Sequence, residues 1–171
     1  MTHVDRPLPD HSATAMPDNR SWVVARTAAG SYRTDLTVGP HTFTADEPLS
    51  VGGGNAGPTP YEYLLGALGA CTAMTIHMYA ARKTWPLDDV IVRLRGGRSH
   101  AADCENCEGP PVGIRRIERQ IELSGSLTDE QRQRLLEIAD RCPVKQTFER
   151  GLQIVAAVEP LSPERGAPRS E

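Results

Sequence analysis

The 171-residue sequence predicts an α+β fold in which antiparallel sheets are built around a long central helix that carries a cysteine. Three observations predict this class. Short alternating segments fill the first third of the chain, a helical segment follows over about residues 61–83, and strand and helix patterns then alternate to residue 158. Helices that cover one face of a largely antiparallel sheet define the α+β class. A chain of this length is expected to bury one core, so residues 21–158 are predicted to form a single domain.

The two ends of the chain are expected to be disordered tails. Residues 1–20 and 159–171 are rich in proline, serine and charged residues and contain almost nothing large and apolar. Such segments bury too little apolar surface to offset the entropy cost of ordering them.

Three short strands are predicted before the helix, at residues 21–26, 31–38 and 41–46. The middle one alternates most clearly, so that one of its faces would carry Tyr32, Thr34, Leu36 and Val38. Turns that contain glycine separate the strands, and this spacing is typical of an antiparallel meander. A glycine-rich loop at residues 51–60 then leads to the helix.

The long helix has a clear start, because Thr59 can act as N-cap, Pro60 suits the first helical position and Glu62 completes a capping box. At 100° per residue, one stripe of this helix contains Cys71, which is therefore expected on the buried side. The full stripe is Leu64, Leu68, Cys71, Thr75, Met78 and Arg82.

The second half repeats strand and helix patterns. Strands are predicted at residues 89–95, 117–125 and 152–158. A second capping box at Thr128 starts a helix that ends near Arg141, and Pro143 can open another short helix.

The composition gives no indication that the protein binds nucleic acid or spans a membrane. The net charge of -3 and the isoelectric point near 6.0 give no basic footprint for nucleic acid. No stretch approaches the ~20 apolar residues that a membrane helix needs, and the first residues lack the apolar centre of a signal peptide. We therefore expect a cytoplasmic protein without nucleic-acid or membrane partners.

Four cysteines in such a protein indicate thiol chemistry rather than a structural disulfide framework. Cys71 lies about three turns into its helix, where the helix dipole gives a thiolate no help, and an isolated cysteine on an apolar face is often only a small buried hydrophobe. Cys142 either ends one helix or caps the next. Cys104 and Cys107 form a CxxC pair that suits half a zinc site, an auxiliary redox dithiol or idle thiols. The residues alone identify no nucleophile.

Two segments carry a resemblance to a known family: PTPYEYLLGALGACTAMTIHMYAARK at 58–83 and ADRCPVKQTFERG at 139–151. A helix of small residues around a cysteine, followed by a downstream helix that closes on Cys-Pro, resembles the OsmC/Ohr family, and most closely its OsmC-like branch. The resemblance spans about residues 30–158.

The resemblance implies an intertwined homodimer and a thiol-dependent peroxidase. Cys71 would reduce an organic hydroperoxide or hydrogen peroxide and become a sulfenic acid, which Cys142 would resolve as a disulfide. A dithiol reductant such as a lipoylated protein would restore both thiols, and no metal, haem or flavin cofactor is implied.

The resemblance also implies an arginine and a glutamate near the first cysteine. Arg33 is the first candidate for the arginine and Arg26 the second. The family's glutamate directly follows the proline at the helix start, where this chain has Tyr61, so Glu62 is the candidate acid and a plain capping residue is its alternative. A non-catalytic redox sensor, a carrier of a small apolar ligand, and a zinc-dependent module built on the CxxC pair remain the alternative functions.

Overall fold

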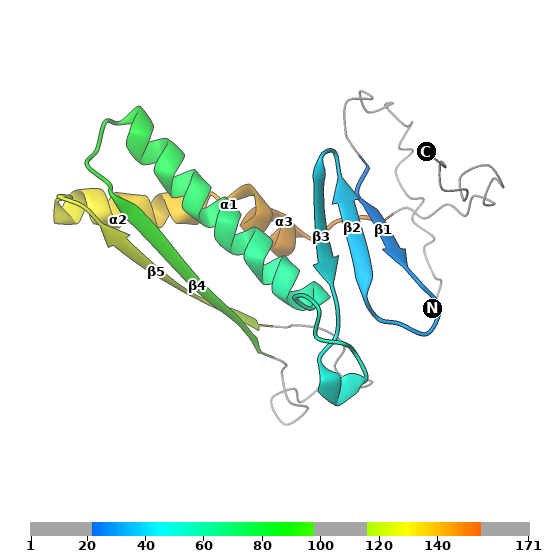
Figure 1. Cartoon of the computed structure of the whole chain (residues 1–171). Coiled ribbons are helices and arrows are strands. Elements are labelled where there is room, and N and C mark those ends of the chain that lie inside the picture. The colour runs from blue at the N-terminus through cyan, green and yellow to red at the C-terminus, as the bar shows by residue number, and fades with distance from the viewer. Residues whose placement is uncertain (1–21, 98–115, 155–171) are drawn as a thin grey trace, which may run out of the picture. The chain divides into compact units, whose positions relative to one another are not determined.

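The computed structural model describes residues 22–97 and 116–154, whose contacts divide between two compact units, Met1–Glu62 and Tyr63–Glu171 (Figure 1). The predicted tails and the insert with Cys104 and Cys107 lie outside the described residues. The prediction of one domain over residues 21–158 stays a prediction.

The N-terminal unit contains the predicted antiparallel meander. Strands β1 (Val24–Thr27), β2 (Thr34–Val38) and β3 (His41–Ala45) pair in the order β1-β2-β3. The alternation predicted for the middle strand is confirmed from residue 34 onward, because Thr34, Leu36 and Val38 are half-buried and the residues between them are exposed. Tyr32 is exposed and precedes β2.

A buried carboxylate holds the glycine-rich loop that follows β3. Asp46 is 2% exposed and accepts hydrogen bonds from the amides of Glu47 at 2.8 Å, Gly54 at 3.0 Å and Ala56 at 3.1 Å. These donors, with the Ala56 amide first, hold the pKa of Asp46 below its ordinary value. At Gly53 a Cβ atom would lie 1.9 Å from the Glu47 carbonyl oxygen, so only glycine fits this approach. The loop includes the short 3₁₀ helix η1 (Leu49–Val51).

Helix α1 (Pro60–Arg82) begins with the predicted capping box. The Thr59 hydroxyl oxygen accepts from the Glu62 amide at 3.3 Å, and the Glu62 carboxylate accepts from the Thr59 amide at 2.7 Å and from the Thr59 hydroxyl at 3.0 Å. These bonds satisfy amides that the first helical turn leaves without partners.

The stripe predicted to be buried along α1 was wrong by about one residue. The fully buried positions are Leu68, Thr72, Ile76 and Ala80, whereas Leu64 is 45% and Met78 is 64% exposed. Cys71 is only half-buried. The helix is apolar or small on every side, so the helical periodicity alone did not distinguish the face that packs from the face that does not.

The unit after Glu62 is a sheet of two strands covered by helices. Strands β4 (Asp89–Gly97) and β5 (Arg116–Ser124) pair antiparallel, followed by α2 (Asp129–Ala139) and α3 (Pro143–Arg150) (Figure 1). The capping box of α2 at Thr128 is confirmed. Residues 151–154 form no strand, and the rest of the strand predicted at 152–158 lies outside the described residues.

The core of this unit joins α1, α2 and the sheet. Ile76 and Ala80 of α1 pack with Leu135 and Ala139 of α2, all at most 1% exposed. Each large side chain buried in this way contributes about 1.5–3 kcal/mol. Around the cluster lie Tyr79, Trp85, Leu87, Val90, Ile121, Leu123 and Leu127.

Glycine allows α1 to lie close to the sheet. A Cβ atom at Gly69 would stand 2.9 Å from Cδ1 of Leu94 on β4. At the other end of the sheet, Gly125 has φ 125°. A Cβ atom at this residue would lie 2.2 Å from the Pro86 carbonyl oxygen. Arg132 of α2 donates to the carbonyl oxygens of Leu123 at 2.6 Å and Gly125 at 2.9 Å, which fixes the start of α2 against β5.

By length and composition α1 is able to span a membrane, contrary to the expectation from the sequence. It is 23 residues long with a mean hydropathy of 1.4 over its most apolar window. The core helix of a soluble protein meets the same criterion. The stripe that includes Ile76 and Ala80 packs in the core of its unit, and 22% of the apolar window of α1 is buried.

Candidate active site

Two cysteines far apart in the sequence meet in the larger unit. Cys71 lies in the middle of α1, and Cys142 is the N-cap residue of α3. The thiols are free, and each shifts the pKa of the other, so the two side chains are neighbours. Their separation of 71 residues in the sequence does not require this contact, which packing of α1 against the junction between α2 and α3 creates.

The two thiols differ in access. Cys142 is 0% exposed, whereas Cys71 is half-buried. A solute therefore reaches the sulfur of Cys71 more readily than that of Cys142.

The surroundings of Cys71 favour the protonated thiol. Burial raises the pKa of the Cys71 thiol, and the neighbouring Cys142 raises it further. The Val144 amide and the Thr75 hydroxyl act in the opposite direction without reversing the effect. This agrees with the expectation that the dipole of its own helix cannot activate Cys71.

The surroundings of Cys142 favour the thiolate. Burial is the largest influence and acts against the charge, yet the pKa of Cys142 is lowered, because four donors together outweigh it. They are the Lys145 amide, the Cys71 thiol, the Thr72 hydroxyl and the Val144 amide. The sequence left two positions open for Cys142, and the structure resolves them: it caps α3 rather than merely ending α2.

The neutral Cys142 side chain makes no capping hydrogen bond to the first turn of α3. Pro143 at the first helical position has no N–H group, so the nearest free amides of the first turn belong to Val144 and Lys145. These amides lie close enough to the sulfur to stabilise its anion. Sequence reasoning found Cys142 but missed the hydroxyls of Thr72 and Thr75, whose only signal was their position one and four residues after Cys71.

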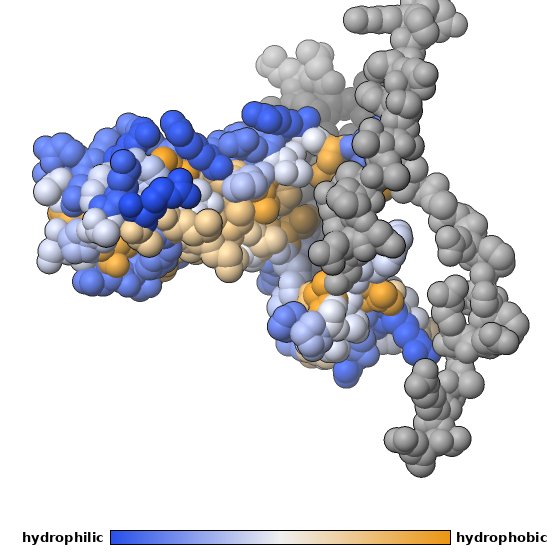
Figure 2. Space-filling model, turned by 90° about the horizontal axis from the view of Figure 1, so that it is seen from above, coloured by the Kyte–Doolittle hydropathy of each residue, from blue (hydrophilic) through white to orange (hydrophobic). Residues whose placement is uncertain are grey.

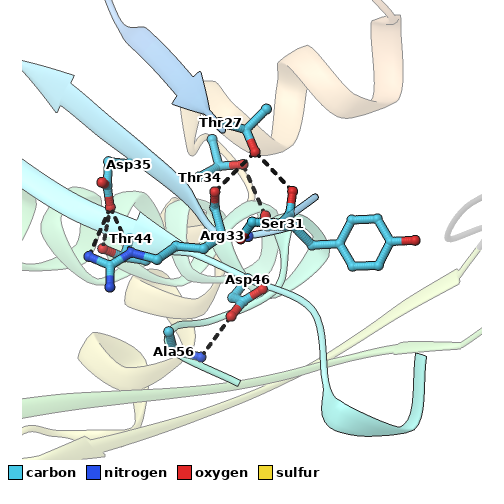
Figure 3. A network of polar contacts seen from close by, with 9 residues as sticks. Thr27, Ser31, Arg33, Thr34, Asp35, Thr44, Asp46 and Ala56 are labelled. Carbon is cyan, nitrogen blue, oxygen red and sulfur yellow. Dashed lines mark hydrogen bonds and ion pairs between the residues drawn. The ribbon is translucent and has the colours of Figure 1, made fainter. Parts of the chain in front are cut away.

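Arg33 belongs to the N-terminal unit and is paired there. Its guanidinium donates to the Asp35 carboxylate, with Nε at 3.3 Å and Nη2 at 3.2 Å, and the hydroxyl of Thr44 donates to the same oxygen at 3.0 Å (Figure 3). The Thr44 hydroxyl first and Arg33 second hold the pKa of Asp35 below its ordinary value. Arg26, the second candidate, lies opposite Asp35 in the β1–β2 register. An activating role of either arginine stays a prediction.

Glu62 also belongs to the N-terminal unit, and its carboxylate is engaged with Thr59 in the capping box. The Thr59 amide, followed by the Thr59 hydroxyl, holds the pKa of Glu62 below its ordinary value, so the group is an anion at neutral pH. The capping interpretation is confirmed, and a catalytic role of Glu62 stays a prediction.

The residues that the structure describes contain no cluster of three or more histidine, cysteine or acidic side chains able to hold a metal ion. The candidate half-site at Cys104 and Cys107 lies outside them.

Comparison with known proteins identifies the family. The model of the OsmC-like protein family matches residues 52–156, more than half of the chain and including both Cys71 and Cys142. The chain therefore belongs to the OsmC-like family. No curated protein sequence matches it.

Solved structures agree on the fold. An OsmC-like protein from Mycoplasma pneumoniae is 21% identical, with a TM-score of 0.62, over 77% of this chain and 89% of that one. A protein from Psychrobacter arcticus, described as a putative osmotic stress induced and detoxification response protein, is 18% identical, with a TM-score of 0.60, over 79% and 91%. The organic hydroperoxide resistance protein OhrB of Bacillus subtilis is 20% identical, with a TM-score of 0.50, over 74% and 89%. The predicted OsmC-like α+β fold is confirmed.

Proposed function

We propose that this protein is a cytoplasmic thiol-dependent peroxidase that reduces organic hydroperoxides or hydrogen peroxide. The contact between the thiols of Cys71 and Cys142 carries the proposal, because one attacking and one resolving sulfur must meet during turnover. Membership of a family that includes an organic hydroperoxide resistance protein supports the choice of substrate.

Unequal access supports the assignment of roles. Cys71 is the more accessible thiol and is assigned the attack, whereas Cys142 is buried beside it and is assigned the resolving step. The Cys71 thiolate attacks the terminal peroxide oxygen, so that an S–O bond forms, the O–O bond breaks and an alkoxide leaves to become an alcohol. Cys142 then attacks the sulfenic sulfur, which forms the disulfide and releases hydroxide. The peroxide takes up two electrons, one from each thiol.

A dithiol reductant, such as a lipoylated protein, would return the pair to its reduced state by thiol–disulfide exchange. Arg33 and Glu62 are proposed to assist Cys71, on the family resemblance alone. The sequence departs from the family at Tyr61, which is 39% exposed, so we expect any contribution of an acid to come from Glu62 rather than from that position.

The exposed face of α1 supports the proposed homodimer. Met74 is 63% and Met78 is 64% exposed, and the exposed Gly66, Ala67 and Ala70 extend the same small and apolar surface. In Figure 2 the unit that contains α1 shows apolar residues at its surface beside strongly hydrophilic ones. Exposed apolar patches of this kind mark protein interfaces, and a second copy of the chain is the partner that the resemblance implies.

Mass spectrometry after one equivalent of cumene hydroperoxide tests the proposal. We expect a disulfide between Cys71 and Cys142 in the wild type, and a sulfenic acid trapped at Cys71 in the variant Cys142→Ser. The variant Cys71→Ser is the matched control and should show neither product. An unchanged thiol at Cys71 after exposure to the peroxide would contradict the proposal.

A further inference from the structure

An arginine on the sheet is bound to the end of the helix that precedes Cys142. Arg119 lies on β5, and its side chain is 19% exposed. Its Nη1 donates to the Ala139 carbonyl oxygen at 3.2 Å, and its Nη2 donates to the Asp140 carboxylate at 2.7 Å. Ala139 is the last residue of α2 and Asp140 is its C-cap. The planar guanidinium therefore holds one main-chain and one side-chain oxygen at the same helix end.

The Ala139 carbonyl oxygen also accepts a hydrogen bond from the Cys142 amide, at 3.3 Å. A carbonyl oxygen has two lone pairs, so it can accept both bonds at once. The last carbonyls of a helix lack partners within the helix, and a cationic side chain is favourable beside them. The backbone that carries the Cys142 sulfur is thus connected through one oxygen atom to Arg119.

Ala139 also belongs to the core that α1 shares with α2. Its side chain is 0% exposed and packs with Ile76 and Ala80 of α1. Only residues 140 and 141 separate Ala139 from Cys142, which is itself 0% exposed. The place of Cys142 against the helix that carries Cys71 therefore depends on a short segment, whose first residue is held by the core and by Arg119.

The ion pairs around Asp140 are the weaker part of this arrangement. Oδ1 of Asp140 lies 2.7 Å from Nη2 of Arg119 and 3.7 Å from Nζ of Lys145 on α3. The Asp140 side chain is 60% exposed, and exposed ion pairs contribute little. The bond from Arg119 to the carbonyl oxygen of the fully buried Ala139 is therefore the one that fixes the turn between α2 and α3.

We propose that Arg119 is a positioning residue for the resolving step, because it holds this turn so that the Cys142 sulfur stays beside the Cys71 sulfur. The inference rests on the proposed peroxidase function. In that function Cys142 attacks the sulfenic sulfur of Cys71, the S–S bond forms, the S–O bond breaks and hydroxide leaves. A misplacement of about 1 Å can slow a reaction about a hundredfold. Since the bond from the Cys142 amide to Ala139 survives the loss of Arg119, we expect a smaller effect, about tenfold.

The variant Arg119→Met tests the proposal, with Arg132→Met as the matched control. Arg132 binds the opposite end of α2 to the sheet in the same manner, donating to the carbonyl oxygens of Leu123 and Gly125. Each variant removes one arginine that joins α2 to β5, so both should lower the free energy of unfolding. Only Arg119→Met removes a contact to the segment that carries Cys142.

The two steps of the reaction are followed separately. Each full-length protein is mixed with one equivalent of cumene hydroperoxide and quenched rapidly with acid, and the Cys71 sulfenic acid and the Cys71–Cys142 disulfide are quantified by peptide mass spectrometry. We expect Arg119→Met to form the sulfenic acid at the wild-type rate and to convert it to the disulfide about tenfold more slowly. Arg132→Met should perform both steps at the wild-type rates. Equal slowing of the second step in both variants, or wild-type conversion in Arg119→Met, would overturn the proposal.

A second measurement uses no peroxide. The reduced protein is equilibrated with reduced and oxidised glutathione, and oxidised glutathione takes up two electrons and becomes two thiols as the Cys71–Cys142 disulfide forms. We expect Arg119→Met to lower the equilibrium constant for the disulfide about tenfold and Arg132→Met to leave it unchanged. Lysine keeps the charge but cannot reach both oxygens at once, so Arg119→Lys should also lower the constant, by a smaller factor. If Arg119→Met does not fold, a wild-type constant in Arg119→Lys overturns the proposal.

The two measurements separate this inference from the peroxidase function. If Cys71 of the wild type does not react with peroxide, while Arg119→Met lowers the equilibrium constant with glutathione, the peroxidase function fails and positioning of Cys142 by Arg119 stands. If the wild type forms the disulfide with peroxide, while Arg119→Met changes neither measurement, the inference fails and the peroxidase function stands.

Discussion

Replacing Thr59 with alanine removes the hydroxyl at the start of the helix that carries Cys71. This hydroxyl accepts from the Glu62 amide at 3.3 Å and donates to the Glu62 carboxylate at 3.0 Å, whereas the 2.7 Å bond from the Thr59 amide survives the change. Loss of an N-cap threonine costs about 0.5–2 kcal/mol. Because one strong bond of the box remains, we expect the middle of this range, about 1 kcal/mol.

Urea unfolding measures this loss. With a slope of about 2 kcal/mol per molar urea for a small protein, a loss of about 1 kcal/mol lowers the midpoint by about 0.5 M without changing the slope. An unchanged midpoint would refute the argument that this capping box stabilises α1.

The same variant separates the two roles of Glu62. If Glu62 only caps the helix, Thr59→Ala and Glu62→Gln leave the rate of Cys71 oxidation by cumene hydroperoxide unchanged under conditions where the protein is folded. If Glu62 assists Cys71, as the family resemblance implies, Glu62→Gln lowers the rate and Thr59→Ala does not.

Two further predictions concern packing and pH. Leu135→Ala should lower the free energy of unfolding by about 2–5 kcal/mol, because Leu135 is 0% exposed in the core. The neighbouring Leu136 is 39% exposed, so Leu136→Ala should lower it clearly less in the same urea experiment. Equal losses in the two variants would contradict the described core. Asp46→Asn should lower the urea midpoint at pH 7 more than at pH 3. The pKa of Asp46 is lowered in the folded protein, so its stabilisation is present above the unfolded value near 3.9 and is lost as the pH falls through the folded one; an equal loss at both pH values would refute this.

Local signals in the sequence predicted most of the elements. Both capping boxes, at Thr59 and Thr128, depend on residues three apart, and both form as predicted. Alternation of half-buried and exposed residues in β2 is equally local, and it placed Leu36 on the half-buried face.

Tertiary packing decided what the sequence did not. In α1 nearly every position is small or apolar, so the buried face is chosen by contact with α2 and the sheet, and Ile76 rather than Met78 packs in the core. The contact of Cys71 with Cys142 depends on the same packing. The burial of the Thr72 hydroxyl within α1 could not be inferred, because a threonine within a helix is most often an ordinary surface or core residue.

Catalytic turnover tests the proposed peroxidase most directly. Consumption of cumene hydroperoxide is measured with a large excess of dihydrolipoamide over the protein, for the wild type and for the variants Cys71→Ser and Cys142→Ser. We expect many peroxides reduced per wild-type chain and no turnover above the protein-free rate in Cys71→Ser. In Cys142→Ser we expect strongly reduced turnover, because the sulfenic acid is not resolved within the chain. Turnover by Cys71→Ser at the wild-type rate, or none by the wild type, would contradict peroxidase chemistry at this cysteine pair.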